Sequence, residues 1–356
     1  MKNLRHFSKH DTPTTNNLVK KFKNELFFFL SVNSVNRQQL FSGISKDQIT
    51  VKIPHRISGF FQMMDPNSVM ETNNPVKIGS RGGGPALTAY GKTRLYLKKS
   101  PSLGRDQKFR IIINQKEVTQ KAKTSLRVLK LFAPYIPPNA YVDVHHTFDL
   151  PVGAGYGSSG AGALGIAFGL QKLLNLSFSL EKAASFAHIA EVENHTGLGT
   201  VGGQFSGGLS ITLHPGFPFH MKIIPHDSNL RVVTGTFGSL STKSILTDSN
   251  YKQMIYAVGK KAMRLMHQDF SVQNYLNVCQ FFLQKTQIMS KLNLTEVSQL
   301  IEDLNARDII GAGMNQLGRS VFAFCSQQEA DTIKDVFLSY NGLKTVQILK
   351  IHPELE

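Results

Sequence analysis

The residues best suited to chemistry form a glycine-rich segment near the middle of the chain, residues 151–162, which read Pro-Val-Gly-Ala-Gly-Tyr-Gly-Ser-Ser-Gly-Ala-Gly. Glycine lets the backbone approach phosphate oxygens without a Cβ, and a following helix offers unpaired N–H donors at its N-terminus. Ser158 and Ser159 add hydroxyls that suit phosphate or Mg²⁺. We therefore interpret the segment as a phosphate-binding loop, with a structural turn as the alternative.

The same glycines also satisfy the dinucleotide-binding pattern G-x-G-x-x-G over residues 155–160, and Glu181 follows about 20 residues later. The position in mid-chain and the paired serines favour a metal-bound phosphate over a pyrophosphate turn. The P-loop pattern G-x-x-x-x-G-K-[ST] is absent, because no lysine directly follows the glycines. An NAD(P)-dependent oxidoreductase is therefore a minor alternative.

A phosphate-binding loop of this kind needs a strand before it and a helix after it. Residues 140–149 alternate apolar and polar side chains, which is typical of a half-buried strand. Residues 161–174 are rich in alanine, leucine and glycine, which predicts a helix that packs closely on its neighbours. The sequence thus places the loop at a strand-to-helix turn.

A second helix is predicted over residues 179–194, where apolar side chains recur with helical spacing and Ser179 can cap the start. His188 and Glu191, near its end, are spaced i, i+3, so they share one face and could both point into a site. A solvated pair of side chains is the alternative.

Two further segments have anion-binding character. Residues 79–84 combine four glycines with Ser80 and Arg81, and these offer backbone N–H groups and a guanidinium suited to a carboxylate. The alternative there is a hairpin turn. Residues 238–243, which include Thr242, predict a helix start with hydroxyls and a lysine, and a simple helix cap is the alternative.

The rest of the chain mixes strand and helix patterns, and its last helix and strand complete a ferredoxin-like layer. The predicted strands are residues 48–54, 91–99, 109–113 and 344–352, the predicted helices are 119–132, 251–266, 272–291 and 328–339, and a strand pair, 221–224 with 230–235, is predicted to close the first domain.

The length of 356 residues predicts two domains in one globular unit, and a hydrophobic content of 41% is enough to bury a large core. The net charge of +16 attracts anions, but the positive residues are scattered and no RRM, KH, helix-turn-helix or zinc-finger pattern is present. We therefore expect small anionic substrates and no nucleic acid. Cys279 and Cys325 lie far apart without a CxxC pattern, which indicates a reducing compartment and no zinc site.

The first residues are polar and basic, and the sequence predicts an N-terminal extension over residues 1–47. The apolar stretch within it, residues 26–30, is too short to span a bilayer and lacks a cleavage-site pattern. We therefore predict a cytoplasmic protein without a membrane partner. A homodimer is left open.

The phosphate-binding loop closely resembles the nucleotide-phosphate loop of the GHMP kinase superfamily, P-x-x-x-G-L-G-S-S-A-A, with Tyr156 in place of the leucine and Gly160 in place of the first alanine. Four other segments resemble the archaeal pantoate kinases, a family of GHMP-type enzymes, in the same order. These are residues 54–61 (Pro-His-Arg-Ile-Ser-Gly-Phe-Phe), 78–84 (Ile-Gly-Ser-Arg-Gly-Gly-Gly), 187–199 (Ala-His-Ile-Ala-Glu-Val, then Thr-Gly-Leu-Gly) and 311–324 (Gly-Ala-Gly-Met-Asn-Gln-Leu-Gly-Arg-Ser-Val-Phe-Ala-Phe).

The resemblance implies an α+β, two-domain GHMP kinase fold. Residues 48–236 would form an ATP-binding domain like the second domain of ribosomal protein S5, and residues 237–356 a ferredoxin-like domain. It also implies ATP and Mg²⁺ as cofactors and the phosphorylation of pantoate to 4-phosphopantoate in coenzyme A biosynthesis. By this resemblance ATP is held by Pro151, Gly153, Gly155, Gly157, Ser158, Ser159 and Gly160, Mg²⁺ by Ser159 and Glu191, and pantoate by Ser80, Arg81, His188 and Thr242.

Two positions depart from the pantoate kinase pattern. Thr200 stands where that family has an aspartate, the candidate catalytic base, and Thr212 stands where it has an arginine for the substrate carboxylate. Phosphoryl transfer depends mainly on positioning and charge neutralisation, so loss of a base does not abolish it. We expect Thr200 to line the substrate. The alternatives are a GHMP-type kinase for another small alcohol and a non-catalytic binding protein with the same fold.

Overall fold

The computed structural model describes residues 34–64, 74–99, 108–240 and 249–355, so the prediction for Thr242 lies outside the described residues. In these residues a nine-stranded sheet forms the first layer, with the order β10-β9-β5-β8-β6-β7 and with β3 and β4 also paired to β5. Its strands are β2 (Phe41–Ser42), β3 (Gln48–Arg56), β4 (Phe60–Met63), β5 (Ser80–Lys99), β6 (Phe109–Ile113), β7 (Lys116–Glu117), β8 (Ala140–Phe148), β9 (Leu209–His214) and β10 (His220–Ile223).

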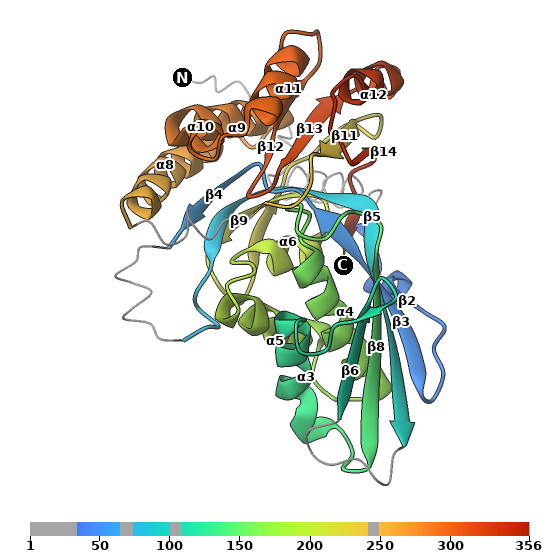
Figure 1. The fold of residues 1–356 in the computed structure, drawn as a ribbon. Coiled ribbons are helices and arrows are strands. Elements are labelled where there is room, and N and C mark those ends of the chain that lie inside the picture. The colour runs from blue at the N-terminus through green and yellow to red at the C-terminus, as the bar shows by residue number, and fades with distance from the viewer. Residues whose placement is uncertain (1–33, 65–73, 100–107, 241–248, 356) are drawn as a thin grey trace, which may run out of the picture.

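Helices cover one face of this sheet (Figure 1). Helix α4 packs directly on β3 and β5. The contact is so close that a Cβ on Gly165 would clash with Thr93 and one on Gly169 would clash with Leu95. The glycines that weaken the helix intrinsically therefore allow close packing. The helices are α3 (Lys123–Phe132), α4 (Ser158–Leu173), α5 (Leu180–Glu193) and α6 (Thr200–Ser206), with short 3₁₀ turns η1 (Arg37–Leu40) and η3 (Ala133–Tyr135).

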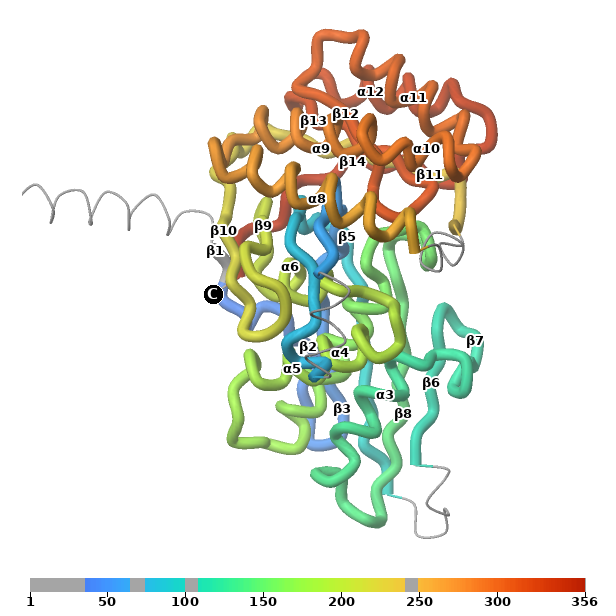
Figure 2. The backbone as a smooth tube through the Cα atoms, turned by 90° about the vertical axis from the view of Figure 1, so that its left-hand side faces the viewer, coloured from blue at the N-terminus to red at the C-terminus, as the bar shows by residue number. Residues whose placement is uncertain are grey.

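The second sheet has the antiparallel order β12-β13-β11-β14 and is covered by the C-terminal helices. Its chain order, strand-helix-strand-strand-helix-strand, is that of a ferredoxin-like layer, as predicted. Figure 2 shows this part gathered at one end of the molecule, away from α3 and β6. The elements are β11 (Arg231–Thr236), α8 (Ser249–Gln268), α9 (Val272–Thr286), α10 (Ile288–Lys291), α11 (Thr295–Asn305), β12 (Gly311–Asn315), β13 (Ser320–Cys325), α12 (Ala330–Leu338) and β14 (Thr345–Leu349).

The predicted pairing of residues 221–224 with 230–235 is wrong. Strand β10 pairs with β9, whereas β11 pairs with β13 and β14 in the second sheet. The burial explains the difference, because all six residues of β11 are buried and a strand buried on both faces belongs inside a sheet. Strand β11 therefore opens the second sheet, and the domain limits 48–236 and 237–356 stay predictions.

The predicted glycine loop over residues 79–84 is also wrong, and so is the alternative of a hairpin turn. Residues 80–84 begin the long strand β5. A Cβ on Gly83 would clash with the carbonyl oxygen of Ser210, and one on Gly84 would clash with that of Ile57. The glycines are therefore needed for close approach between neighbouring backbones. A smaller difference is that the helix predicted over residues 272–291 is divided into α9 and α10 at Gln287, whose φ is 50°.

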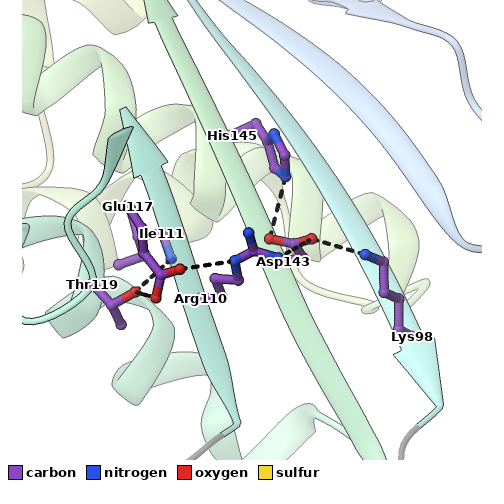
Figure 3. Close-up of polar contacts among 7 residues, drawn as sticks. All are labelled: Lys98, Arg110, Ile111, Glu117, Thr119, Asp143 and His145. Atoms are coloured by element: carbon purple, nitrogen blue, oxygen red, sulfur yellow. Dashed lines mark hydrogen bonds and ion pairs between the residues drawn. The ribbon is translucent and has the colours of Figure 1, made fainter. Parts of the chain in front are cut away.

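One buried carboxylate lies on the face of the first sheet that points away from the helices. Asp143 alternates with the core residues Val142 and Val144 in β8. Its Oδ2 lies 2.8 Å from Lys98 Nζ and its Oδ1 lies 3.3 Å from His145 Nε2 (Figure 3). Burial alone would raise the pKa of Asp143, but these hydrogen bonds and charges outweigh burial and lower it. Because its charge is compensated, this cluster stabilises the sheet.

The two sheets share one hydrophobic core, while the helices α3 to α5 pack in another. In the shared core Phe60 of β4 contacts Tyr275 of α9, with ring centroids 6.2 Å apart, and Tyr275 stacks on Phe324 of β13 at 5.9 Å. The chain then returns to the first layer, where isolated bridges join Ile351 to Leu87 and Glu354 to Gly207. Strand β15 (Glu354–Leu355) pairs in parallel with β1 (Ser34–Val35) in a separate two-stranded sheet. Among the described residues, no helix combines the length and the apolarity that crossing a membrane requires.

Candidate active site

The phosphate-binding loop connects β8 to α4, as predicted. Gly153, Gly155 and Gly157 have φ angles of 80°, 92° and 69°, which other residues rarely adopt. Gly157 is the N-cap of α4 and no side chain caps the helix there, so the first N–H groups of α4 are available to a ligand. The positive end of the helix macrodipole lies at the same place. The backbone is thus arranged for an anion.

Glu191 of α5 lies beside the first turn of α4. It is only 1% exposed, and its Oε1 accepts a hydrogen bond of 2.6 Å from the Thr196 hydroxyl. Its Oε2 is buried and has no hydrogen-bond partner in the described part of the chain. Burial raises the pKa of Glu191, while the Thr196 and Ser159 hydroxyls oppose that rise. A Cβ on Gly160 would lie 3.5 Å from Oε2, which places this oxygen at the base of the loop.

Helix α6 brings Thr200 and Gln204 to the other side of the same turn. A Cβ on Gly157 would lie 2.6 Å from Thr200 Cγ2, and one on Gly160 would lie 2.5 Å from Gln204 Oε1. Gln204 Nε2 donates to the carbonyl oxygens of Pro54 and Gly157 at 2.9 and 3.0 Å, so the orientation of the amide is fixed. Its Oε1 then lacks a partner among the described residues. Gln204 was not predicted as a site residue, although its i, i+4 spacing from Thr200 places both on one face.

Four buried polar atoms without a partner among the described residues lie around the loop. Most buried polar groups in proteins are hydrogen-bonded, and each unpaired one costs about 1–3 kcal/mol. Several here come from four different elements yet lie close to the same loop. They are Ser158 Oγ, Glu191 Oε2, Gln204 Oε1 and Asn315 Nδ2. A polar ligand at the loop would provide the missing partners.

The structure brings Ser80 and His188 together beside the start of α6. His188 is 2% exposed, and its Nε2 donates to the carbonyl oxygen of Ile78 at 2.9 Å. Burial lowers its pKa, and the hydrogen bond to Ile78 opposes the change. His188 thus holds the segment that leads into Ser80. A Cβ on Gly199 would lie 2.7 Å from Ser80 Oγ, so this hydroxyl adjoins Thr200 along the chain.

Arg81 points away from this group. Neighbouring residues of a strand face opposite sides, so Arg81 and Ser80 diverge. The Arg81 guanidinium donates from Nε to Gln62 Oε1 at 3.0 Å and lines a cavity of about 220 Å³ with His214 and Tyr256. The geometry therefore separates Arg81 from the phosphate-binding loop.

A different arginine, Arg56 at the end of β3, lies next to α6, and no role was predicted for it from the sequence. Its Nη1 donates to Ser210 Oγ at 2.6 Å and its Nη2 donates to the Ser210 carbonyl oxygen at 2.8 Å. In the described part of the chain it forms no ion pair with a carboxylate. Burial lowers its pKa to about 10, so it remains charged at neutral pH. A Cβ on Gly203 would clash with this guanidinium, which places a positive charge one helical turn from Thr200.

Residues of the second sheet form hydrogen bonds with the phosphate-binding loop. Ser320 Oγ donates to the Ala154 carbonyl oxygen at 2.6 Å. Tyr156, which is fully buried, bonds the Thr234 hydroxyl of β11 at 2.9 Å. The loop is therefore fixed by β11 and β13 as well as by its own helix.

Comparisons with known proteins agree with this geometry. The family described as GHMP kinases N terminal domain matches residues 123–207, which include the loop, Glu191 and Thr200. The chain is 28% identical over 275 residues to a pantoate kinase of Methanocaldococcus jannaschii, covering 77% of this chain and 92% of that protein. It is 30% identical over 205 residues to a pantoate kinase of Thermococcus kodakarensis, covering 56% and 65%.

Solved structures show the same fold. A phosphotransferase related to the CoA biosynthesis pathway superposes with a TM-score of 0.72 at 25% identity, covering 86% of this chain and 97% of that one. A homoserine kinase from Cytophaga hutchinsonii superposes with a TM-score of 0.58 at 16% identity, covering 88% and 98%. The predicted α+β, two-domain arrangement is thus confirmed.

Proposed function

This chain has the N-terminal domain and the two-domain fold of the GHMP kinases, and on that premise we propose that it transfers the γ-phosphoryl group of ATP to a hydroxyl of pantoate. The product would be 4-phosphopantoate, an intermediate of coenzyme A biosynthesis. The observation that carries the proposal is the set of unpaired buried polar atoms around the phosphate-binding loop. The similarity to pantoate kinases of two organisms supports the choice of substrate.

The residues of the loop fit the phosphates of ATP. The three glycines with positive φ and the uncapped start of α4 provide N–H donors for phosphate oxygens. Ser158 Oγ, which has no partner among the described residues, can donate to the same anion. Strands β11 and β13 keep the loop in place before ATP arrives, so binding costs little conformational entropy.

Mg²⁺ fits the carboxylate at the base of the loop. In the described residues no three His, Cys, Asp or Glu side chains gather into a metal site. Mg²⁺ normally keeps several waters and substrate phosphates as ligands, so one carboxylate and one hydroxyl are sufficient. Glu191 Oε2 and the Ser159 hydroxyl would hold it, and when bound it would neutralise charge on the transferred phosphoryl group.

The acceptor alcohol would lie between the loop and the start of α6. Ser80 and Thr200 supply hydroxyls there, and His188 keeps Ser80 in position through Ile78. Thr200 cannot act as a strong base, so its role would be to orient the hydroxyl that attacks. The guanidinium of Arg56 adds positive charge on the same side, which favours an acidic substrate.

An ADP-release assay tests the proposal. Mg²⁺–ATP is supplied with pantoate, homoserine, mevalonate and a panel of sugars, and we expect turnover with pantoate. Glu191→Gln should lower kcat at least 100-fold, since it removes the charge that holds Mg²⁺. Glu193→Gln is the matched control, because Glu193 lies two residues away and pairs on the surface with Arg127. Equal loss in both variants would contradict the role of Glu191.

A kinase for another small alcohol is the second candidate, and the threonines at 200 and 212 favour it. Thr212 is buried in β9 opposite Gly82, on the face that carries Ser80, and cannot bind a carboxylate as an arginine would. Turnover with another alcohol alone would establish this candidate. Activity found only in Thr200→Asp, or with no alcohol in either protein, would indicate that the fold was kept and the reaction lost.

A further inference from the structure

We propose that Asn315, the last residue of β12, donates a hydrogen bond from the second domain to a phosphate oxygen of the bound nucleotide. This inference rests on the proposed ATP-binding function and assigns a new residue to it. Asn315 is fully buried, with 0% of its surface exposed. It belongs to the hairpin β12–β13. Asn315 follows the phosphate-binding loop by more than 150 residues in sequence, so only the folded chain brings the two together.

The orientation of the Asn315 amide is fixed by its neighbour. Its Oδ1 accepts a hydrogen bond of 3.0 Å from the backbone N–H of Ser58. Only an oxygen can accept this bond, so the amide nitrogen must occupy the other position. The backbone N–H of Gln316 donates to the Ser58 carbonyl oxygen at 2.7 Å and reinforces the same contact. Asn315 cannot rotate without breaking this arrangement.

The remaining group, Asn315 Nδ2, is a buried donor with no partner among the described residues. A Cβ on Gly155 would lie only 3.2 Å from it, so the amide faces the middle glycine of the phosphate-binding loop. Gly155 has a φ of 92°, and its lack of a side chain keeps the amide close to the loop backbone. An unpaired N–H donor beside a loop suited to an anion is placed to donate to an oxygen of that anion.

The ligand class that supplies such an acceptor is a nucleoside di- or triphosphate. A phosphate oxygen seated at the loop would accept from the backbone N–H groups of the first domain and from Asn315 of the second. The bond would then connect the two parts of the molecule through the nucleotide. A purely structural role for Asn315, limited to the hydrogen bond from Ser58, is the alternative that the experiment must exclude.

Asn315→Asp separates the two roles. The aspartate keeps an oxygen for the Ser58 N–H, loses the Nδ2 donor and adds a negative charge. Binding of Mg²⁺–ADP and of adenosine is measured by titration calorimetry, and thermal unfolding is measured on the same samples. We expect the Kd for Mg²⁺–ADP to rise at least 10-fold while adenosine affinity changes little. Because Asn315 is fully buried, the added charge should also lower Tm, so the ratio of the two affinities is the deciding quantity.

Asn277→Asp is the matched control. Asn277 lies on the exposed side of α9, where its Oδ1 accepts from Gln273 Nε2 at 3.4 Å, and the substitution adds the same charge. It should leave both affinities unchanged. Should the aspartate variant not fold, Asn315→Ala is compared by its ratio of Mg²⁺–ADP to adenosine affinity, which should fall.

Three results would overturn the inference. The first is an unchanged Mg²⁺–ADP affinity in Asn315→Asp with the wild-type protein binding normally. The second is a parallel loss of ADP and adenosine affinity with a lower Tm, which would show a structural role only. The third is failure of the wild-type protein to bind Mg²⁺–ADP, which would refute the proposed function and this inference together.

Discussion

Tyr156 shows how a single side chain adapts the phosphate-binding loop to this molecule. The GHMP loop that it resembles has leucine at this position, whereas the tyrosine here is fully buried and reaches Thr234 of the second sheet. Thr234 donates its own hydroxyl hydrogen to the Val321 carbonyl oxygen at 2.8 Å, so the tyrosine must be the donor. The departure from leucine therefore adds a hydrogen bond between the loop and β11.

Tyr156→Phe tests this bond at the residue scale. The phenylalanine keeps the packing and removes only the hydroxyl, so unfolding free energy should fall by about 1 kcal/mol. The KM for Mg²⁺–ATP should change less than twofold, because the backbone donors of the loop remain. Urea denaturation and ADP-release kinetics measure both quantities. Tyr135→Phe, at a position 45% exposed, should change neither, and an equal effect of both substitutions would contradict the assignment.

At the scale of elements, patterns of neighbouring residues were enough to predict the loop, α4 and α5. Glycine spacing marked the loop, and Ser179 caps α5 as expected, with Lys182 N donating to its hydroxyl at 3.2 Å. The glycines of β5 were misinterpreted because their cause lies elsewhere, in the backbones of Ile57 and Ser210. A local pattern shows that a glycine is needed but does not show which distant backbone approaches it.

For the site, too, the sequence predicted some residues and not others. Glu191 and Ser80 follow motifs and were found in the sequence, and the structure places both near Thr200. Arg56 and Asn315 lie within segments that resemble the family, at 54–61 and 311–324, but no role was assigned to either residue. Among the described residues Arg56 forms no ion pair with a carboxylate and Asn315 Nδ2 has no partner, and only tertiary contacts show this. The catalytic and binding roles of all these residues stay predictions until they are measured.

His146 joins three elements and makes their packing sensitive to pH. Its Nδ1 lies 2.9 Å from the Thr93 hydroxyl of β5, and its Nε2 lies 3.2 Å from the Ser125 hydroxyl of α3. Burial, assisted by the charge of the neighbouring His145, lowers its pKa to about 3. The folded protein therefore keeps His146 neutral at a pH where the unfolded chain would bind a proton.

Lowering the pH should destabilise the folded protein through His146. Between pH 6.5 and about 3 the unfolded state binds one more proton at His146, so stability falls as pH falls, by about 1.4 kcal/mol per pH unit. Urea denaturation at pH 6.5, 5.5 and 4.5 should show this slope, and His146→Gln should reduce it. Ser125→Ala removes a hydrogen bond without removing the titration, so it should lower stability equally at each pH. A slope unchanged in His146→Gln would contradict the assignment.

At the scale of the whole molecule, the shared core makes the two sheets dependent on each other. Phe60 of the first sheet contacts Tyr275, which in turn stacks on Phe324 of the second. Ile57 and Ile211 of the first sheet belong to the same core. Neither sheet can lose its partner without exposing apolar surface to water, at about 25 cal/mol per Å².

Thermal unfolding should therefore be a single cooperative transition by calorimetry, although the described residues form two large sheets. Phe60→Ala in the shared core and Phe132→Ala in the core of α3 to α5 should each cost about 3–5 kcal/mol and shift this one transition. Two separate transitions, each moved by one variant only, would contradict the coupling.

The parallel pairing of β15 with β1 has a consequence for biosynthesis on the ribosome. Gly207 of the first layer is bridged to Glu354, and Leu355 is buried in the core that α3 to α5 share. At translation rates of about 5–20 residues per second, about 7 to 30 seconds separate the synthesis of Gly207 from that of its partner. The first layer therefore waits, partly uncovered, until residues 354–355 have been synthesised.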